Sequence, residues 1–280
     1  MLSLQDIVAR TGAHKVHNLN ITGKGVKVSI LDSGIHCQHY FLKNSVIKKF
    51  QLAAGSLKDE VFGHGTHVAS IVRAITPQAS IINIKILDDK GTTTLSTIME
   101  GIELAVDNKA NVINISGGLG MDCAENHPLA RLIDQVSDEV MVVCAVGNQG
   151  PKDGPSLPAL ARGCVAVGAL TETGRTAFFS ARGPACGRVW PDVVSWGENI
   201  LGAAPPNDWK AVSGTSQAAP QVTGALALVR EVLGRNLSRQ EIEVLLQQSC
   251  DRLDSKAKSN VSGWGRLNIE RMIDVVAKFK

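Results

Sequence analysis

The chain has 280 residues, 44% hydrophobic and 20% charged, which is the composition of a globular protein with a substantial core. Its formal net charge of +3 is small and dispersed, which argues against nucleic acid or an anionic membrane surface as the main partner. No apolar run approaches the length of a membrane span. We therefore expect no nucleic-acid partner and no membrane partner.

Short apolar runs rich in β-branched residues alternate with segments of helical periodicity. The apolar runs are typical of strands buried on both faces and cover residues 26–32, 80–87, 110–117, 140–148 and 164–170. The helix-compatible segments between them are residues 65–75, 94–109 and 127–137. This alternation predicts an α/β fold, doubly wound, with a mainly parallel central sheet and helices on both faces.

The last third of the chain has a different pattern. Residues 171–210 are rich in Gly, Pro and Trp and indicate loops and short strands. Ser238 and Glu241 have the spacing of a capping box, and a second helix is expected after Asn268. Because no internal repeat or linker is visible, we expect one domain over residues 1–280, and we expect it to be a monomer.

Several polar residues stand where strands end or helices begin. The first strand ends at Asp32, and Asn148 ends the strand at 140–148. His64 lies between two glycines at a helix start, and Ser216 opens another helix in AVSGTSQAAPQVTGALALV. Singly, such residues are more often turn formers or helix caps. Because ligands gather at the carboxyl ends of parallel strands, their joint presence there indicates a site.

Together these four residues supply the groups that acyl transfer needs. A serine hydroxyl is a poor nucleophile unless an imidazole accepts its proton. A carboxylate on the other ring nitrogen fixes the tautomer, and an amide can stabilise the oxyanion.

The motifs ILDSGI, GHGTHVAS, SGG, AVGNQG and SGTSQAAPQVTG resemble those of the subtilisin-like serine proteases (subtilases), in the family's Asp–His–Ser order. The resemblance extends from about Gly23 to Ile273. It implies a serine endopeptidase in which Asp32 orients His64, His64 is the general base and Ser216 is the nucleophile. Asn148 and the Ser216 backbone amide would be the oxyanion donors.

The resemblance also implies where a substrate peptide binds. Ser116, Gly117 and Gly118 match one edge that pairs with the substrate backbone, and the opposite edge matches Gly91, Thr92, Thr93 and Leu95. Ala145, Gly147 and Ser156 match positions of the primary specificity pocket. No matched pocket position is acidic, although Asp153 is close in sequence, so we expect an uncharged side chain of small to medium size before the scissile bond.

The setting of Ser216 fits this role. Gly214, Ala218 and Ala219 are small enough to let a peptide and His64 approach the hydroxyl. Pro220 is expected in the first helical turn, where a missing N–H costs little. His67 is interpreted as a buried structural histidine.

The sequence departs from the family in the calcium loop that secreted relatives often have after the histidine helix. No insertion separates that helix from the next strand, and Phe41 stands near where an aspartate ligand would be. We expect no metal and no other cofactor. No pro-domain or signal peptide is visible, and six cysteines without a C-x-x-C pair favour a cytoplasmic location, although an even number of cysteines would also permit disulfides. A secreted protein stays possible if a leader and pro-segment are removed.

Two other functions stay open at this point. A peptide macrocyclase or ligase would use the same acyl-enzyme but give it to an amine. A pseudoprotease would hold peptides by edge-strand pairing without cleaving them, although all four chemical residues are present. A peptide or protein is the expected partner in each case.

Overall fold

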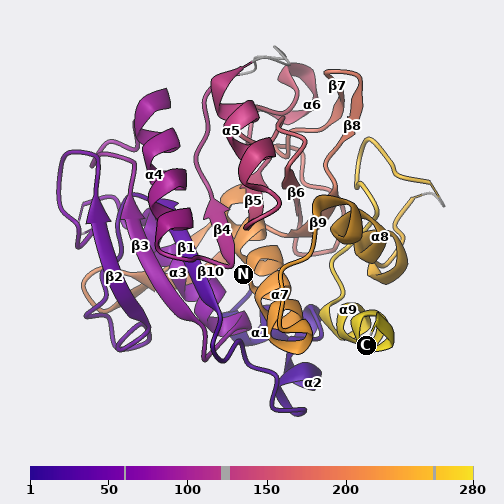
Figure 1. Ribbon diagram of the computed structural model, residues 1–280, viewed down its shortest axis with the longest axis horizontal. Helices are drawn as coiled ribbons and strands as arrows, with labels where there is room; N and C mark the ends of the chain where they lie inside the picture. The colour runs from indigo at the N-terminus through magenta and orange to yellow at the C-terminus, as the bar shows by residue number, and fades with distance from the viewer. Residues whose placement is uncertain (60, 121–126, 255–256, 280) are drawn as a thin grey trace.

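The computed structural model describes residues 1–59, 61–120, 127–254 and 257–279 (Figure 1). Within these residues a central sheet of seven strands has the order β2-β3-β1-β4-β5-β6-β9, and every neighbouring pair is parallel. Its strands are β1 (Lys27–Asp32), β2 (Val46–Gln51), β3 (Ser80–Lys85), β4 (Val112–Ile115), β5 (Met141–Ala145), β6 (Cys164–Leu170) and β9 (Val193–Trp196). Two antiparallel hairpins lie outside it, formed by β7 (Gly183–Ala185) with β8 (Arg188–Trp190) and by β10 (Ile200–Ala204) with β11 (Asp208–Val212).

The helices cover both faces of this sheet. They are α1 (Leu4–Arg10), α2 (Ala13–His17), α3 (His64–Ile75), α4 (Leu95–Asp107), α5 (Pro128–Val136), α6 (Gly150–Asp153), α7 (Thr215–Leu233), α8 (Arg239–Ser249) and α9 (Ile269–Val276), with a short 3-10 helix at Ala277–Phe279. Successive strand residues point to opposite faces, so Ile30 packs in the core shared with α3 and α7, whereas Leu31 packs in the core shared with α4 and α5. The predicted doubly wound, parallel α/β fold is therefore confirmed.

The predicted strands and helices are present, with ends trimmed by a few residues. Ser238 caps α8 in a capping box with Glu241, and Asn268 caps α9, as expected. The sequence reading missed the edge strand β2, whose middle is exposed and carries Lys48 and Lys49 rather than an apolar run. It also gave residues 171–210 only loops and short strands, whereas β9, in that range, pairs with β6 and extends the main sheet.

The parallel arrangement decides where a site can form. All seven strands end at the same edge of the sheet, and β1 and β4 are neighbours. Helices α3 and α7 pack against each other on one face. Their first turns therefore lie beside the carboxyl ends of the strands, where ligands bind in open α/β sheets. None of the described helices has the length and apolar character required to span a bilayer.

Candidate active site

Asp32 and His64 form a direct pair between the sheet and helix α3. Asp32 is the last residue of β1 and is fully buried, and its Oδ1 lies 2.7 Å from His64 Nδ1. Because a carboxylate only accepts, His64 Nδ1 carries a proton, and in the neutral imidazole Nε2 keeps its lone pair. Burial works to lower the pKa of His64, but the charge and hydrogen bond of Asp32 outweigh it, so the pKa of His64 is raised.

Glycines on both sides of His64 allow this close approach. Gly63 caps α3 in the left-handed region, at φ 72°. At Gly65 an added Cβ would lie 2.1 Å from the Gly34 carbonyl oxygen and 3.1 Å from Asp32 Cβ. A side chain at residue 65 would therefore separate the start of α3 from the end of β1.

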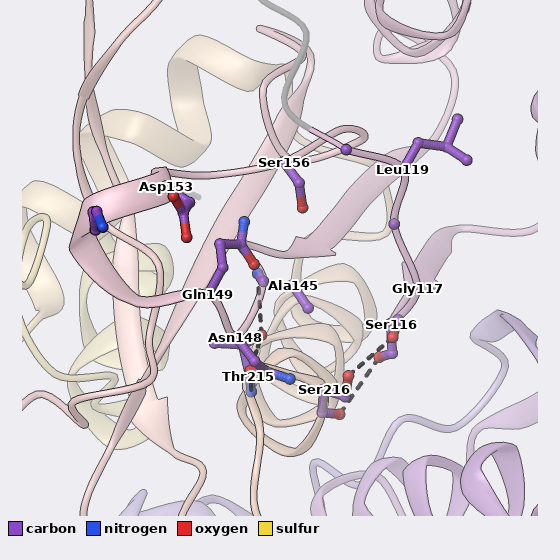
Figure 2. A pocket seen from close by; sticks show the side chains of 14 residues that line it. Ser116, Gly117, Leu119, Ala145, Asn148, Gln149, Asp153, Ser156, Thr215 and Ser216 are labelled. Atoms are coloured by element: carbon purple, nitrogen blue, oxygen red, sulfur yellow. Dashed lines mark hydrogen bonds between the residues drawn. The ribbon is translucent and has the colours of Figure 1, made fainter. Parts of the chain in front are cut away.

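Ser216 is the second residue of α7 and faces the loop that follows β4. Its hydroxyl donates to the Ser116 carbonyl oxygen at 2.9 Å, and Ser116 Oγ lies 3.4 Å from the Ser216 carbonyl oxygen (Figure 2). Among the described residues no hydrogen bond joins Ser216 to His64. The Ser216 N–H belongs to the first helical turn, where N–H groups have no intrahelical partner.

The expected position of Pro220, in the first turn of the helix, is wrong. Pro220 is the sixth residue of α7 and lies inside the helix, so it removes the N–H that would bond the Ser216 carbonyl. The Ser116 hydroxyl is close enough to serve that carbonyl instead. Ala218 and Ala219 are fully buried in the core, and the expectation that their small size gives access to the Ser216 hydroxyl stays a prediction.

Asn148 is held in one orientation by Thr215. Its Oδ1 accepts the Thr215 backbone N–H at 2.8 Å and the Thr215 hydroxyl at 3.1 Å. This assignment directs the Nδ2 donors away from Thr215. An added Cβ at Gly214 would lie 3.2 Å from Asn148 Nδ2, so the glycine keeps space beside that amide.

A pocket of about 580 Å³ joins most of the expected binding residues (Figure 2). Seven of the predicted residues line it with Thr215 and Ser216: Ser116, Gly117, Gly118, Ala145, Gly147, Asn148 and Ser156. The sequence reading did not place Leu119, Gln149, Lys152 or Asp153 here, yet they also line the pocket. Among the described residues that line the pocket, one is acidic and one is basic.

The opposite predicted edge lies outside this pocket. Gly91 belongs to a turn, Thr92 and Thr93 follow it without strand structure, and Leu95 begins α4. An added Cβ at Gly91 would lie 2.9 Å from the ring of Phe62, and that ring stacks on His64 with centroids 5.6 Å apart. This contact connects Gly91 to the neighbourhood of His64.

His67 is buried as expected. Its Nε2 lies 3.0 Å from the Ile200 carbonyl oxygen and 3.1 Å from that of Lys210, which makes it a donor to the β10–β11 hairpin. Burial lowers the pKa of His67 to about 4, so it is neutral at neutral pH.

Asp59 was missed by sequence reasoning. It lies in the loop between β2 and α3 with 1% exposure, and its carboxylate contacts Ser33, Gly63 and Thr66. The one signal in the sequence is an acidic residue five positions before His64, and nothing in that spacing indicates burial.

In the described part of the chain, no group of three or more His, Cys, Asp or Glu side chains could hold a metal ion. Phe41 packs on Trp209 with ring centroids 5.5 Å apart. The expectation of a protein without metal or cofactor stays a prediction.

Comparison with known proteins agrees with the motifs. Residues 23–265 match the model of the subtilase family. The chain is 34% identical to the major intracellular serine protease of Bacillus subtilis (strain 168), covering 79% of this chain and 75% of that protein. It is 32% identical to Subtilisin Savinase of Lederbergia lenta, covering 94% and 96%.

A solved structure of the S218A mutant of the protease domain of PatA superimposes with a TM-score of 0.81 at 29% identity, covering 93% of this chain and 98% of that one. The family match spans most of the chain, and the aligned structure has the same fold. The chain therefore belongs to the subtilase family.

Proposed function

We propose that this protein is a serine endopeptidase that hydrolyses peptide bonds through Ser216, His64 and Asp32. The observation that carries the proposal is the 2.7 Å bond between Asp32 Oδ1 and His64 Nδ1, which leaves His64 Nε2 able to accept a proton. Family membership supports serine protease activity and a peptide or protein as substrate.

In the proposed reaction the Ser216 hydroxyl leaves the Ser116 carbonyl and donates to His64 Nε2. Catalytic hydrogen bonds are often completed only when substrate is bound. Ser216 Oγ then attacks the scissile carbonyl carbon while His64 takes its proton, and Asp32 stabilises the imidazolium. Asn148 Nδ2 and the Ser216 N–H donate to the oxyanion that forms.

Collapse of this intermediate breaks the peptide C–N bond. His64 gives its proton to the leaving amine, which departs and leaves an acyl group on Ser216 Oγ. Water then attacks the acyl carbon, with His64 again the base, and releases the acid and free Ser216.

The proposed binding mode uses the pocket beside Ser216. The backbone of Ser116, Gly117 and Gly118 would pair with the substrate on one side, with Gly91, Thr92, Thr93 and Leu95 on the other. Ala145, Gly147 and Ser156 would surround the side chain before the scissile bond. At Gly118 an added Cβ would lie 2.7 Å from the Leu157 carbonyl oxygen, so this part of the wall needs a glycine.

Cleavage of a diverse peptide library tests the proposal. Wild type should hydrolyse a subset of peptides, and Ser216→Ala should lose turnover while keeping its circular dichroism spectrum. Ser213→Ala is the matched control. Ser213 precedes Ser216 by three residues, its side chain is exposed, and its hydroxyl contacts Asn199. Undiminished hydrolysis by Ser216→Ala would refute the proposal.

The same assay separates the other functions. Hydrolysis adds one water, so the summed mass of its products exceeds that of the peptide by 18 Da. A ligase would give cyclic or joined peptides whose summed mass shows no such gain. For a pseudoprotease, the wild type and the Ser216→Ala variant would bind peptides equally well, and neither would cleave them.

For its location, we keep the cytoplasm as a prediction, with secretion as the alternative. One relative is an intracellular protease, and Cys37, Cys144, Cys164 and Cys250 are free thiols. Cys186 is disulfide-bonded, which supports the alternative.

A further inference from the structure

We propose that Asp59 is a positioning residue for the proposed Asp32–His64 pair, fixing the start of α3 against the end of β1 and placing a second negative charge behind the imidazole. The inference deepens the proposed function and rests on it. Asp59 does not line the pocket beside Ser216, so its action passes through other residues.

The Asp59 carboxylate is saturated with donors. Its Oδ1 accepts the Ser33 hydroxyl at 2.6 Å and the Gly63 backbone N–H at 3.0 Å. Its Oδ2 accepts the Thr66 backbone N–H at 3.0 Å and the Thr66 hydroxyl at 2.9 Å. Each oxygen therefore receives one backbone N–H, which cannot reverse its role, and one hydroxyl.

The two hydroxyls are themselves oriented by backbone donors. The Gly65 N–H donates to Ser33 Oγ at 2.9 Å, and the His36 N–H donates to Thr66 Oγ1 at 2.9 Å. Each hydroxyl thus accepts from the backbone and directs its proton to Asp59. An acceptor with four donors and no donor of its own is what a carboxylate requires.

These contacts connect both members of the proposed pair. Ser33 directly follows Asp32, whereas Gly63 directly precedes His64 and Thr66 lies in the first turn of α3. Asp59 is therefore a bridge between the residue after the carboxylate and the residues around the imidazole. Displacement of this bridge would change the 2.7 Å contact between Asp32 and His64.

The charged groups around His64 come from several elements. Asp32 on β1 and Asp59 on the loop both raise the pKa of His64 against the effect of burial. His67, one turn along α3, is neutral at neutral pH because burial lowers its pKa to about 4. Lys85 on β3 is buried, but it donates to the Ser33 carbonyl oxygen at 2.7 Å and pairs with Asp89 at 3.1 Å.

Burial raises the pKa of Asp59 from its usual range, and the hydrogen bonds from Ser33 and Thr66 oppose that rise. Asp59→Asn removes the negative charge and, in either orientation of the amide, sets an NH₂ group against the backbone N–H of Gly63 or Thr66. The variant should therefore lower the pKa of His64 and loosen its position.

The first test measures the His64 imidazole directly. Histidine labelled with ¹³C at Cε1 is titrated by NMR in the Ser216→Ala background, and the His64 signal is assigned by its loss in His64→Gln. Asp59→Asn should move the His64 midpoint to lower pH. The control Asp107→Asn makes the same charge change at the far end of α4 and should leave the His64 midpoint unchanged. Equal midpoints in all three proteins would overturn the inference.

The second test measures turnover with Ser216 present. Asp59→Asn should lower kcat by roughly 10²-fold with a much smaller change in KM, because misplacement of a catalytic group by about 1 Å has that effect. The acid limb of its kcat/KM profile should move to lower pH, since a lower pKa means that more acid is needed to protonate His64. A variant with wild-type kcat and an unmoved acid limb would contradict the role.

If Asp59→Asn does not fold, Ser33→Ala carries the test. It removes one donor to Asp59 and the acceptor of the Gly65 N–H. The control is Ser45→Ala, because among the described residues the buried Ser45 hydroxyl bonds only to Leu42. The kcat of Ser33→Ala should be lower than that of Ser45→Ala. Equal kcat values would overturn the inference. If wild type turns over no peptide, the proposed function fails, but the NMR titration still decides the role of Asp59.

Discussion

Asn148 depends on a neighbour whose part in the site the sequence does not reveal. Thr215 gives both its N–H and its hydroxyl to Asn148 Oδ1, and the Gly147 N–H approaches the Thr215 hydroxyl at 3.2 Å. This arrangement leaves the Nδ2 group as the free donor. Thr215 is therefore a positioning residue for the proposed oxyanion donor.

Asn148→Ala should lower kcat by roughly 10²–10³-fold with little change in KM, because its donor acts mainly on the transition state. Thr215→Val, which keeps the shape but removes the hydroxyl, should lower kcat by less. In the double variant kcat should fall by less than the two single effects combined, because both changes act on the same donor, Asn148 Nδ2. Steady-state kinetics on one cleaved peptide measure this, and fully additive losses would show that Thr215 acts independently of Asn148.

The residues predicted from sequence are those that stand in recognisable motifs. Asp32, His64, Asn148 and Ser216 could be proposed as site residues because each sits at a strand end or helix start among small residues. Asp59 and Thr215 could not be assigned a role from sequence. Their roles arise from contacts to Ser33 and Asn148, which are distant in the chain and meet only in the fold.

At the scale of elements, the packing of α3 against α7 sets the distance between the proposed base and nucleophile. His64 begins α3 and Ser216 lies in the first turn of α7. The helices meet at Gly224, where an added Cβ would lie 2.5 Å from Ile75 Cγ2 and 2.6 Å from Ile75 Cβ. The glycine therefore permits an approach that any side chain would prevent.

Gly224→Ala should destabilise the fold by about 1–3 kcal/mol through overpacking, although alanine is the better helix former. Thermal unfolding should show a melting temperature lower by roughly 2–4 °C for each kcal/mol. Ile75→Ala removes Cγ2 but keeps Cβ, so it relieves one of the two close contacts, and the stability loss of the double variant should be smaller than the sum of the two single losses. A melting temperature raised by Gly224→Ala alone would mean that helix propensity dominates at this contact.

The position of Pro220 within α7 could not be predicted from sequence, although the start of the helix near Ser216 could. A proline near a helix start suggests the first turn, but α7 begins at Thr215 and contains Pro220 in its interior. Its missing N–H is compatible with the helix because Ser116 lies beside the Ser216 carbonyl. That compensation comes from the loop after β4 and is invisible in a local pattern.

At the scale of the whole molecule, the parallel sheet was predictable because its central strands are nearly continuous apolar runs. Its two edges were not. The edge strand β2 pairs on one side only and is largely exposed. Its exposed lysines interrupt the apolar pattern by which a buried strand is predicted. At the other edge β9 is short, and residues 263–267 cover it through hydrogen bonds of Val194 with Gly265 and Leu267.

A charged cluster fixes this second edge. Asp192, which precedes β9, is fully buried and pairs with Arg239 of α8 at 2.8 Å and with Lys258 at 2.5 Å. Burial acts to raise the pKa of Asp192, but the two cations lower it overall. The C-terminal third is thus attached to the sheet by contacts that no sequence periodicity reports.

The central claim is that Ser216 is a nucleophile activated by His64. The most direct measurement is covalent labelling with a fluorophosphonate, followed by mass spectrometry of the intact protein and of its peptides. One phosphonate should attach per chain, on Ser216, and His64→Ala should slow the labelling by orders of magnitude while Ser213→Ala should not. Labelling at another serine, or an unchanged rate in the His64→Ala variant, would contradict the account.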